Sequence, residues 1–141
     1  MRNYLPDRIV FDTNIYISFI IQNKLDKLIA LIEKYDLEIF ICDELLKEIK
    51  ATLNKPHIKS KLSFKAAQYI EVIALISENI IIDKRFDRII DPDDNFLIDL
   101  AYCTKSYFLI TEDKLILNHK QINKIKIINM AAFKKMLSEL K

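Results

Sequence analysis

Four carboxylates in this sequence, Asp12, Glu48, Asp94 and Asp113, occupy positions that would let them bind divalent metal together. Carboxylate oxygens are the ligands that Mg²⁺ and Mn²⁺ prefer in proteins. Four such groups on one rim repel one another unless a cation lies among them. A bound divalent ion can activate a water molecule beside a phosphodiester and stabilise the charge of in-line displacement. The chemistry that these residue types predict is therefore that of a metal-dependent nuclease.

The predicted elements select these four from the 20 acidic residues of the chain. Asp12 ends an apolar strand, and Asp113 lies two residues past the end of another. Glu48 borders the buried face of the helix that follows the second strand. Asp94 lies three residues before Leu97 and shares its inward helix face. All four are expected at one edge of the fold.

A structural role could also explain some of these acids. Asp91 is the expected N-cap of a helix with Pro92 at its first position, and the first turn of a helix favours acids such as Asp94. Asp113 could cap the short helix that follows it. Asp12 is harder to explain in this way, because a buried carboxylate at a strand end is costly without a cation nearby.

Apolar periodicity predicts strands that alternate with helices along the chain. The predicted strands cover residues 8–12, 38–42, 80–82, 107–111 and 126–128. The predicted helices cover residues 15–21, 25–35, 43–55, 63–77 and 130–140, with a further helix opening at 91 and a short one at 114–117. Residues 55–62 are expected to form a basic loop. Asp99 points away from Leu97 on its helix and is expected to face water.

This alternation predicts an α/β fold of three layers, α/β/α, with a mostly parallel sheet of four or five strands. Strands that read as continuous apolar runs are typical of a parallel sheet covered on both faces. The length of 141 residues, without a repeat or linker, predicts a single domain over 1–141. Function gathers at the carboxyl ends of parallel strands. That edge is where the four acids are expected.

Composition excludes several other classes of protein. The chain is 51% hydrophobic and 30% charged, as in ordinary globular domains. It contains no glycine, so neither a P-loop nor a dinucleotide-binding turn can be built. Turns are expected to rely on Asn, Asp and Lys instead. Cys42 and Cys103 lie among apolar residues without zinc-ligand spacing, so zinc is not expected.

Charge and targeting signals add weaker expectations. The net charge of +2 does not by itself indicate a nucleic-acid partner. Basic residues cluster in three stretches, at 55–65, 84–88 and 120–126, and either solvated lysines or phosphate contacts could explain each. No apolar run reaches the length of a membrane span, and the amino terminus has no apolar signal core. A cytoplasmic protein without membrane contact is expected.

The chain resembles PIN-domain nucleases, and in particular the PIN proteins classed as toxins of toxin–antitoxin systems, at four acidic motifs in the same order. These are IVFDTN at 9–14, DELLKEI at 43–49, DPDDNFL at 91–97 and LITED at 109–113. The four motifs span nearly the whole chain. Each motif alone is short, and their order makes the resemblance specific.

This resemblance implies metal-dependent cleavage of single-stranded RNA, a homodimer and inhibition by an antitoxin protein. Carried over by motif, the metal-site acids fall on Asp12, Glu48, Asp94 and Asp113. Asn14 would hold the first acid, and Thr111 would support the last. The ion would be Mg²⁺ or Mn²⁺.

The sequence departs from the family pattern at Glu112, where relatives often have a small residue. Glu112 could join the metal site, so the number of ions stays open. Two other classes of function also stay open. One is a non-catalytic PIN-like module that binds RNA or protein. The other is a phospho-acceptor receiver or aspartyl-phosphate phosphatase, although Asn14 stands where the phosphatase pattern has a second Asp.

Overall fold

The computed structural model describes residues 4–83 and 95–140, which form strands and helices in alternation. The strands are β1 (Leu5–Phe11), β2 (Glu38–Ile41), β3 (Glu78–Asn79), β4 (Ser106–Ile110), β5 (Gln121–Ile122) and β6 (Ile125–Ile128). The helices are α1 (Thr13–Ile21), α2 (Leu25–Lys34), α3 (Asp43–Leu53), α4 (Pro56–Lys59), α5 (Ala66–Leu75), α6 (Asn95–Thr104), α7 (Lys114–Leu117) and α8 (Met130–Ser138).

The strands form one sheet in the order β3-β2-β1-β4-β6-β5. Every neighbouring pair is parallel except β5 and β6, which are antiparallel. The predicted mostly parallel sheet is confirmed, with β5 as a strand that the sequence prediction omitted. The third strand was predicted two residues too late. β2 ends at Ile41, which pairs with Asn79, so the residues after 80 lie beyond the end of their partner strand.

The registers bring three strand ends to the same edge of the sheet. Phe11 of β1 pairs with Ile110 of β4, which in turn pairs with Ile128 of β6. From β1 the chain builds β2 and β3 on one side and then returns to build β4 and β6 on the other. The order of strands therefore reverses between β1 and β4, which is where ligands bind in open parallel sheets.

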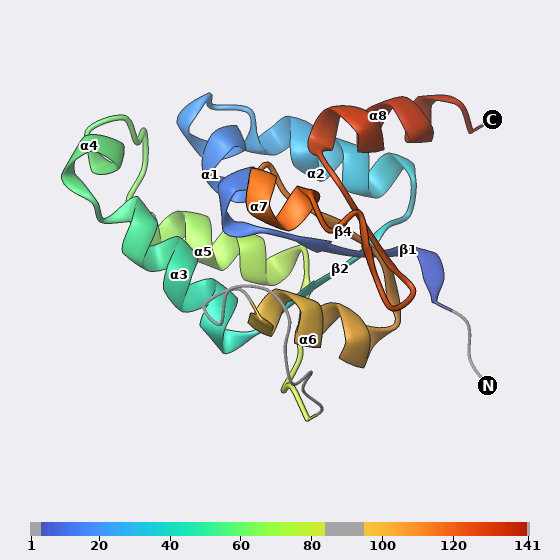
Figure 1. Ribbon diagram of the computed structural model, residues 1–141. Coiled ribbons are helices and arrows are strands. Elements are labelled where there is room, and N and C mark those ends of the chain that lie inside the picture. Colours follow the sequence, from blue (N-terminus) through green and yellow to red (C-terminus); the bar gives the residue numbers. More distant parts are fainter. Residues whose placement is uncertain (1–3, 84–94, 141) are drawn as a thin grey trace.

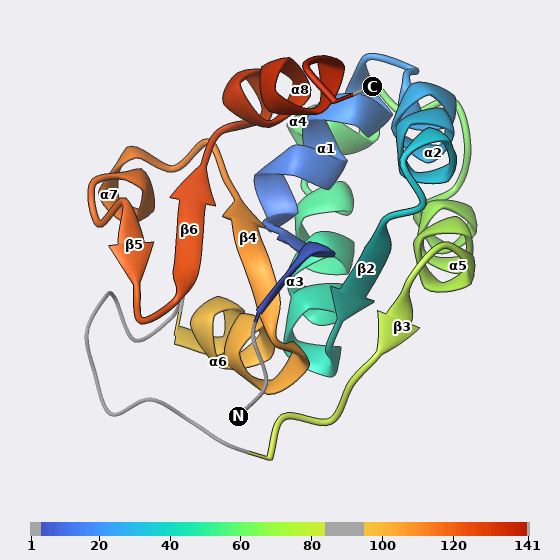
Figure 2. The same ribbon diagram turned by 90° about the vertical axis from the view of Figure 1, so that its right-hand side faces the viewer.

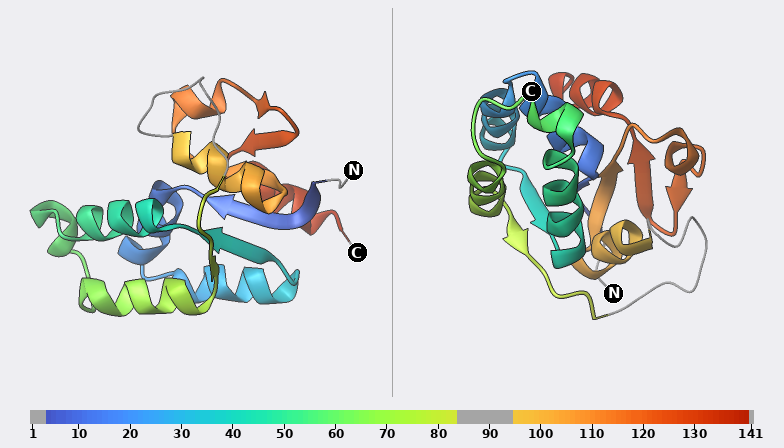
Figure 3. Two further views of the ribbon diagram at one scale, coloured as in Figure 1. Left: turned by 90° about the horizontal axis from the view of Figure 1, so that it is seen from below. Right: turned by 90° about the vertical axis from the view of Figure 1, so that its left-hand side faces the viewer.

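Helices cover both faces of this sheet and give the three layers (Figures 1 and 2). In Figure 1, α1, α2 and α8 lie above the sheet and α6 lies below it, while Figure 2 shows α5 beside the edge formed by β3. Figure 3 shows α3 and the short α4 extending past the carboxyl ends of the strands. Within the described ranges, every helix is too short or too polar to cross a membrane.

The core is centred on β1, whose last residues are fully buried. Ile9, Val10 and Phe11 have no exposed side-chain surface. The Phe11 ring contacts the rings of Tyr16 and Phe133 edge-on, at centroid distances of 5.8 Å and 6.3 Å. Apolar residues on both faces of a central strand explain why 8–12 reads as a continuous apolar run. This packing fixes the place where β1 ends.

Local signals explain where several elements begin. α1 begins at Thr13, two residues earlier than predicted, because Asp12 is its N-cap. Pro56 opens α4 inside the segment predicted as a basic loop, since proline favours the first helical position. Among the residues that the structure describes, five with positive φ take the place of glycine at turns, as predicted from the Asn, Asp and Lys content. They are Asn23, Asp36, Lys105, Lys120 and Asn123.

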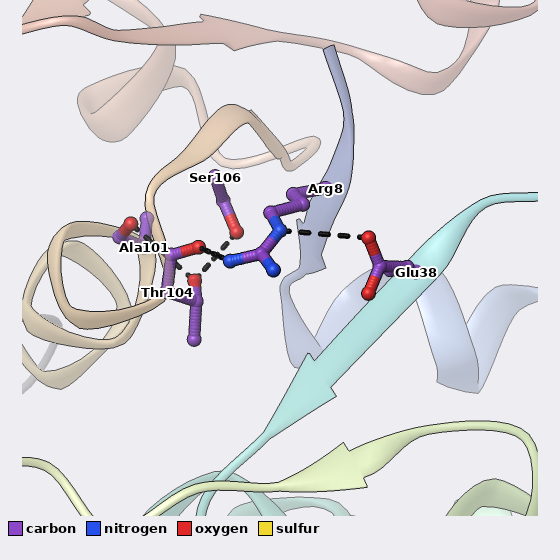
Figure 4. Close-up of polar contacts among 5 residues, drawn as sticks. All are labelled: Arg8, Glu38, Ala101, Thr104 and Ser106. Carbon is purple, nitrogen blue, oxygen red and sulfur yellow. Dashed lines mark hydrogen bonds and ion pairs between the residues drawn. The ribbon is translucent and has the colours of Figure 1, made fainter. Parts of the chain in front are cut away.

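A separate polar cluster closes the opposite, amino-terminal edge of the sheet (Figure 4). Arg8 of β1 donates from Nη1 to the Thr104 carbonyl at 2.7 Å, and its Nε lies 3.5 Å from Glu38 Oε2. The hydroxyls of Thr104 and Ser106 are 2.6 Å apart, and both residues are buried. This cluster ties α6 and β4 to β1 and β2. The candidate acids lie at the opposite edge, where the parallel strands end.

Candidate active site at the carboxyl edge of the sheet

Asp12 lies where β1 ends, and its carboxylate is almost enclosed. The residue is 5% exposed and accepts three hydrogen bonds. Oδ1 accepts from the Thr13 amide at 2.6 Å, which begins α1. Oδ2 accepts from Asn14 Nδ2 at 3.0 Å and from Thr111 Oγ1 at 2.6 Å. Three donors on one carboxylate hold it in a single orientation.

The surroundings of Asp12 raise the pKa of its carboxyl group. Burial is the largest cause, because it disfavours the charged form. The hydrogen bonds from Thr111 and Thr13 lower the pKa, and the negative charges of Glu48 and Asp113 raise it again. The net direction is upward. A cation at this edge would oppose the raising causes and favour the charged form.

Glu48 faces the same edge from the second turn of α3. It is half-buried, and its Oε1 accepts a short hydrogen bond from the Thr13 hydroxyl. Thr13 therefore links the two acids, since its amide binds Asp12 and its hydroxyl binds Glu48. On α3, Leu45 and Ile49 are buried in the core. That packing fixes the side of the helix on which Glu48 lies.

Asp113 lies three residues beyond the end of β4 and caps α7. Its Oδ1 accepts from the Leu115 amide at 2.9 Å, as the capping prediction required. Its own amide donates to Thr111 Oγ1 at 3.0 Å. The cap uses one carboxylate oxygen, so the residue combines a structural role with a place at the site.

Asn14 and Thr111 connect the ends of β1 and β4. Asn14 donates to Asp12, and its Oδ1 accepts from the Glu112 amide at 3.1 Å. Thr111 is fully buried and contacts Asp12, Asn14 and Asp113 through its hydroxyl. Both residues therefore lie where sequence comparison by motif predicted them. Their contacts bring Asp12 and Asp113 to one edge.

Asp12, Glu48 and Asp113 line one open groove of about 510 Å³ between α1 and α3. Its lining also includes Thr13, Asn14 and Lys55. A groove of this kind leaves room for a substrate beside the acids. The donor groups that face it are carboxylate, hydroxyl and amide oxygens, which is the chemistry of a site for a hard divalent cation.

Comparison with protein families gives a match to the model described as PIN domain over residues 8–115. The chain belongs to the PIN-domain family. That stretch includes all four motifs on which the resemblance was based. PIN domains are generally nucleases, which are hydrolases, and generally use divalent metal ions. Comparison with curated protein sequences found no match.

One solved structure similar to this PIN domain is described as VapBC2 from Rickettsia felis bound to a DNA fragment from their promoter. The two chains share 15% sequence identity, with a TM-score of 0.59. The match covers 86% of this chain and 98% of the other. At this level of identity the likeness shows the fold alone. It confirms the three-layer α/β/α prediction.

The donor set of this PIN domain fits a hydrated divalent ion. In 4–83 and 95–140, no group of three or more His, Cys, Asp or Glu side chains is placed to hold an ion directly. Mg²⁺ usually keeps several of its waters and needs only one or two protein carboxylates. Asp12, Glu48 and Asp113 meet that condition around one groove. Asp91 and Asp94 lie outside the described residues.

Glu112, considered as a candidate metal ligand, makes a contact outside the acidic groove. Its Oε2 accepts from the Met130 amide at 2.9 Å, at the amino terminus of α8. It lines a separate small cavity with Lys24 and Lys134, apart from the acidic groove. A carboxylate is favoured at the positive end of a helix. The hydrogen bond from the Met130 amide to Glu112 therefore joins the start of α8 to the segment that follows β4.

Asp99 and the two cysteines differ in how well their burial was predicted. Asp99 was expected to face water and is 2% exposed, so that prediction was wrong; α6 is covered on more sides than the period of its apolar residues indicated. Cys42 is buried in the core as predicted. Cys103 was predicted to fill the core as well but is partly exposed, and its thiol donates to Asp83 Oδ1 at 3.4 Å. The two cysteines do not form a disulfide.

Sequence reasoning missed Thr13 and Lys55 as members of the groove. Thr13 had a signal, since it follows Asp12 directly and can offer both an amide and a hydroxyl. Lys55 had none, because its approach to the acids depends on how α3 packs against α1.

Proposed function

We propose that this PIN domain is an Mg²⁺- or Mn²⁺-dependent endoribonuclease that cleaves single-stranded RNA. The observation that carries the proposal is the shared groove of Asp12, Glu48 and Asp113. Asp12 is nearly enclosed there, and its pKa is raised first by burial and then by the charges of the other two acids. Asp94 is proposed as the fourth acid, on the evidence of its motif. Asn14, Thr111 and Asp91 are proposed as supporting residues.

The bound ion would supply an activated water and charge stabilisation at the phosphodiester. Asp12 would be its best oriented ligand, because three donors fix its carboxylate. Thr13 holds Glu48 toward the same groove. Thr111 keeps the Asp12 carboxylate in place and holds the Asp113 amide through one hydroxyl. Together these contacts keep the acids in position before substrate arrives.

We further propose that the protein is the toxin of a toxin–antitoxin pair, a homodimer inhibited by an antitoxin protein. The similar structure from Rickettsia felis is a VapBC2 complex on promoter DNA, which supports an antitoxin partner for a chain of this fold. The substrate would be RNA in the cytoplasm. Co-purification of the product of a neighbouring small gene, followed by loss of nuclease activity in the complex, tests this part.

A digest of labelled single-stranded RNA with purified protein tests the nuclease proposal. Cleavage should require Mg²⁺ or Mn²⁺ and stop with EDTA. The variants Asp12→Asn, Asp94→Asn and Asp113→Asn should each lose most of it. Asp36→Asn is the matched control, since Asp36 is an exposed turn residue with positive φ that Asn tolerates. Undiminished cleavage by Asp12→Asn and Asp94→Asn would refute the proposed site.

Metal binding by the purified protein distinguishes an enzyme from a non-catalytic binding module. Calorimetric titration should give a binding isotherm for Mn²⁺ at millimolar concentration or below. A chain that binds RNA without cleaving it and takes up no Mg²⁺ or Mn²⁺ would favour the binding module.

A further inference from the structure

A second hollow on the other flank of α3 carries positive charge where the groove carries negative charge. It measures about 750 Å³ and is lined by Lys50, Lys59 and Lys65 together with Phe64 and polar side chains. No acidic residue of the described chain lines it. We call it the basic hollow. It lies between the end of α3, the short α4 and the start of α5.

The basic hollow and the acidic groove lie close to each other along the chain. Glu48 and Lys55 line the groove, whereas Lys50 lines the hollow. Lys55, which lines the groove, is the N-cap of α4, and Lys59, which lines the hollow, ends that helix. One helical turn therefore separates a lysine of the groove from a lysine of the hollow.

The lysines of the hollow have no partner among the acids of the described chain. In residues 4–83 and 95–140, no carboxylate forms an ion pair with Lys50, Lys59 or Lys65. All three side chains are exposed. Unpaired ammonium groups on one surface bind phosphates by releasing counterions, and the strength of that binding depends on salt.

An aromatic ring lies beside these charges. Phe64 is 62% exposed, although large apolar side chains are usually covered. Its ring meets the buried Tyr69 nearly edge-on, at a centroid distance of 6.0 Å. Base stacking on an exposed aromatic ring next to basic side chains is a common way to hold single-stranded nucleic acid.

Three consecutive hydrogen bonds hold the segment that carries Phe64. Ser63 Oγ donates to Asn23 Oδ1 at 2.9 Å, the Phe64 amide donates to the Tyr69 hydroxyl at 3.3 Å, and the Lys65 amide donates to Gln68 Oε1 at 2.9 Å. The backbone that carries Phe64 and Lys65 is thus ordered before a ligand binds. Such order reduces the entropy lost on binding.

We infer that the basic hollow is a second RNA-binding subsite, which holds the single strand that flanks the scissile phosphate. Lys55 would contact the phosphate next to the acids, Lys50, Lys59 and Lys65 the phosphates further along, and Phe64 would stack on a base. The acidic groove repels a polyanion, so a strand held there needs cations beside it. This inference rests on the proposed function, because it takes RNA as the substrate.

Fluorescence anisotropy with labelled RNA tests the inference. The probes are single-stranded RNAs of about four and about twelve nucleotides, within the range of known single-strand sites. The protein carries Asp12→Asn, so that the probes stay intact, and Mg²⁺ is present. In this background, Lys50, Lys59 and Lys65 are all changed to Gln. The matched control changes Lys27, Lys47 and Lys135 to Gln, which removes the same charge from exposed helix positions outside the hollow.

The variant of the hollow should bind the longer RNA at least about tenfold more weakly than the control, with a slope of affinity against salt lowered by about 2. The shorter RNA should bind both proteins alike. With Asp12 intact, KM for the longer RNA should rise while kcat stays the same. Equal binding of the longer RNA by variant and control would overturn the inference.

Phe64 has its own pair of variants. Phe64→Leu should weaken binding of the longer RNA about tenfold, whereas Phe64→Tyr should preserve it because the stacking face remains. Similar melting temperatures of the two variants exclude an effect on folding. If Phe64→Leu binds as tightly as wild type, the stacking role is wrong.

The outcomes also separate this inference from the proposed function. Cleavage by wild type together with equal binding by the two lysine variants would refute the subsite alone. Absence of metal-dependent cleavage in wild type, with the expected loss of binding in the variant of the hollow, would refute the nuclease and leave an RNA-binding surface.

Discussion

Thr111 Oγ1 donates a 2.6 Å hydrogen bond to Asp12 Oδ2 and so joins two residues that are 99 positions apart in the sequence. Each residue directly follows one of the two central parallel strands, at the point where the strand order reverses. Both are buried. The bond therefore fixes the orientation of the Asp12 carboxylate within the sheet edge itself, where there is little freedom to move.

Replacing Thr111 with Val tests this bond. Valine keeps the shape and removes the donor, so we expect a loss of about 1.5–3 kcal/mol in the free energy of unfolding. Since that bond lowers the pKa of Asp12, its loss should raise this pKa further. The acid limb of the activity profile should then move to higher pH. Thr111→Ser, which keeps the hydroxyl, is the control. An unchanged limb in Thr111→Val would contradict the role given to the bond.

Glu48→Gln tests the repulsion between the acids without metal. In the folded protein the pKa of Asp12 is raised, so the folded state keeps a proton that the unfolded chain has released. The free energy of unfolding should therefore fall as pH rises from the ordinary Asp range through the raised pKa. Glutamine removes one raising charge and can still accept from Thr13.

Denaturant unfolding in EDTA measures this effect. The pH should run from about 4, where unperturbed carboxyl groups titrate, to about 8, where they are ionised. We expect the fall in stability to be smaller in Glu48→Gln than in wild type, and added Mg²⁺ to stabilise the variant less. Parallel curves for the two proteins, with equal gains from Mg²⁺, would mean that the charges do not interact.

The sequence predicted the parts of the site that depend on strand ends. Asp12 directly follows the apolar run of β1, and Asp113 lies three residues past the end of β4, so both were expected at the edge where these strands end. Glu48 followed from the buried face of its helix. In each case a local pattern determined the position in space.

The parts that the sequence could not predict depend on packing between distant segments. The link from Thr13 to Glu48 and the approach of Lys55 both require α1 to lie against α3. Asp99 was expected to face water. It is buried because other elements cover that side of α6, and the sequence of the helix alone does not reveal them. The third strand was predicted two residues too late. Its position depends on where β2 ends, since among the described strands β3 pairs only with β2.

Asn14→Asp tests whether an amide is required beside Asp12. Asn14 Nδ2 donates to Asp12 Oδ2 at 3.0 Å, so the substitution places a carboxylate oxygen against another. We expect a less stable protein at neutral pH in EDTA, by about 1–3 kcal/mol, and a further rise in the pKa of Asp12. Mg²⁺ should recover part of the stability. The measurement is the melting temperature with and without Mg²⁺.

Asn14→Ala is the comparison for that variant, since it removes the donor without adding charge. Its melting temperature in EDTA should lie between those of wild type and Asn14→Asp. A variant Asn14→Asp as stable as wild type in EDTA would show that Asp12 is already neutral there or that the two side chains move apart.

Glu112→Ala separates the two roles considered for this residue. Its carboxylate binds the Met130 amide at the start of α8, so its loss should lower the free energy of unfolding by about 1 kcal/mol. Because Glu112 lies outside the lining of the acidic groove, Mn²⁺ affinity and the metal-dependent rate of RNA cleavage should stay near those of wild type. Glu112→Gln should restore part of the stability, since an amide oxygen can still accept from Met130. Weaker Mn²⁺ binding in Glu112→Gln than in wild type would instead place this carboxylate among the metal ligands, since that variant preserves the contact with α8 and changes only the charge.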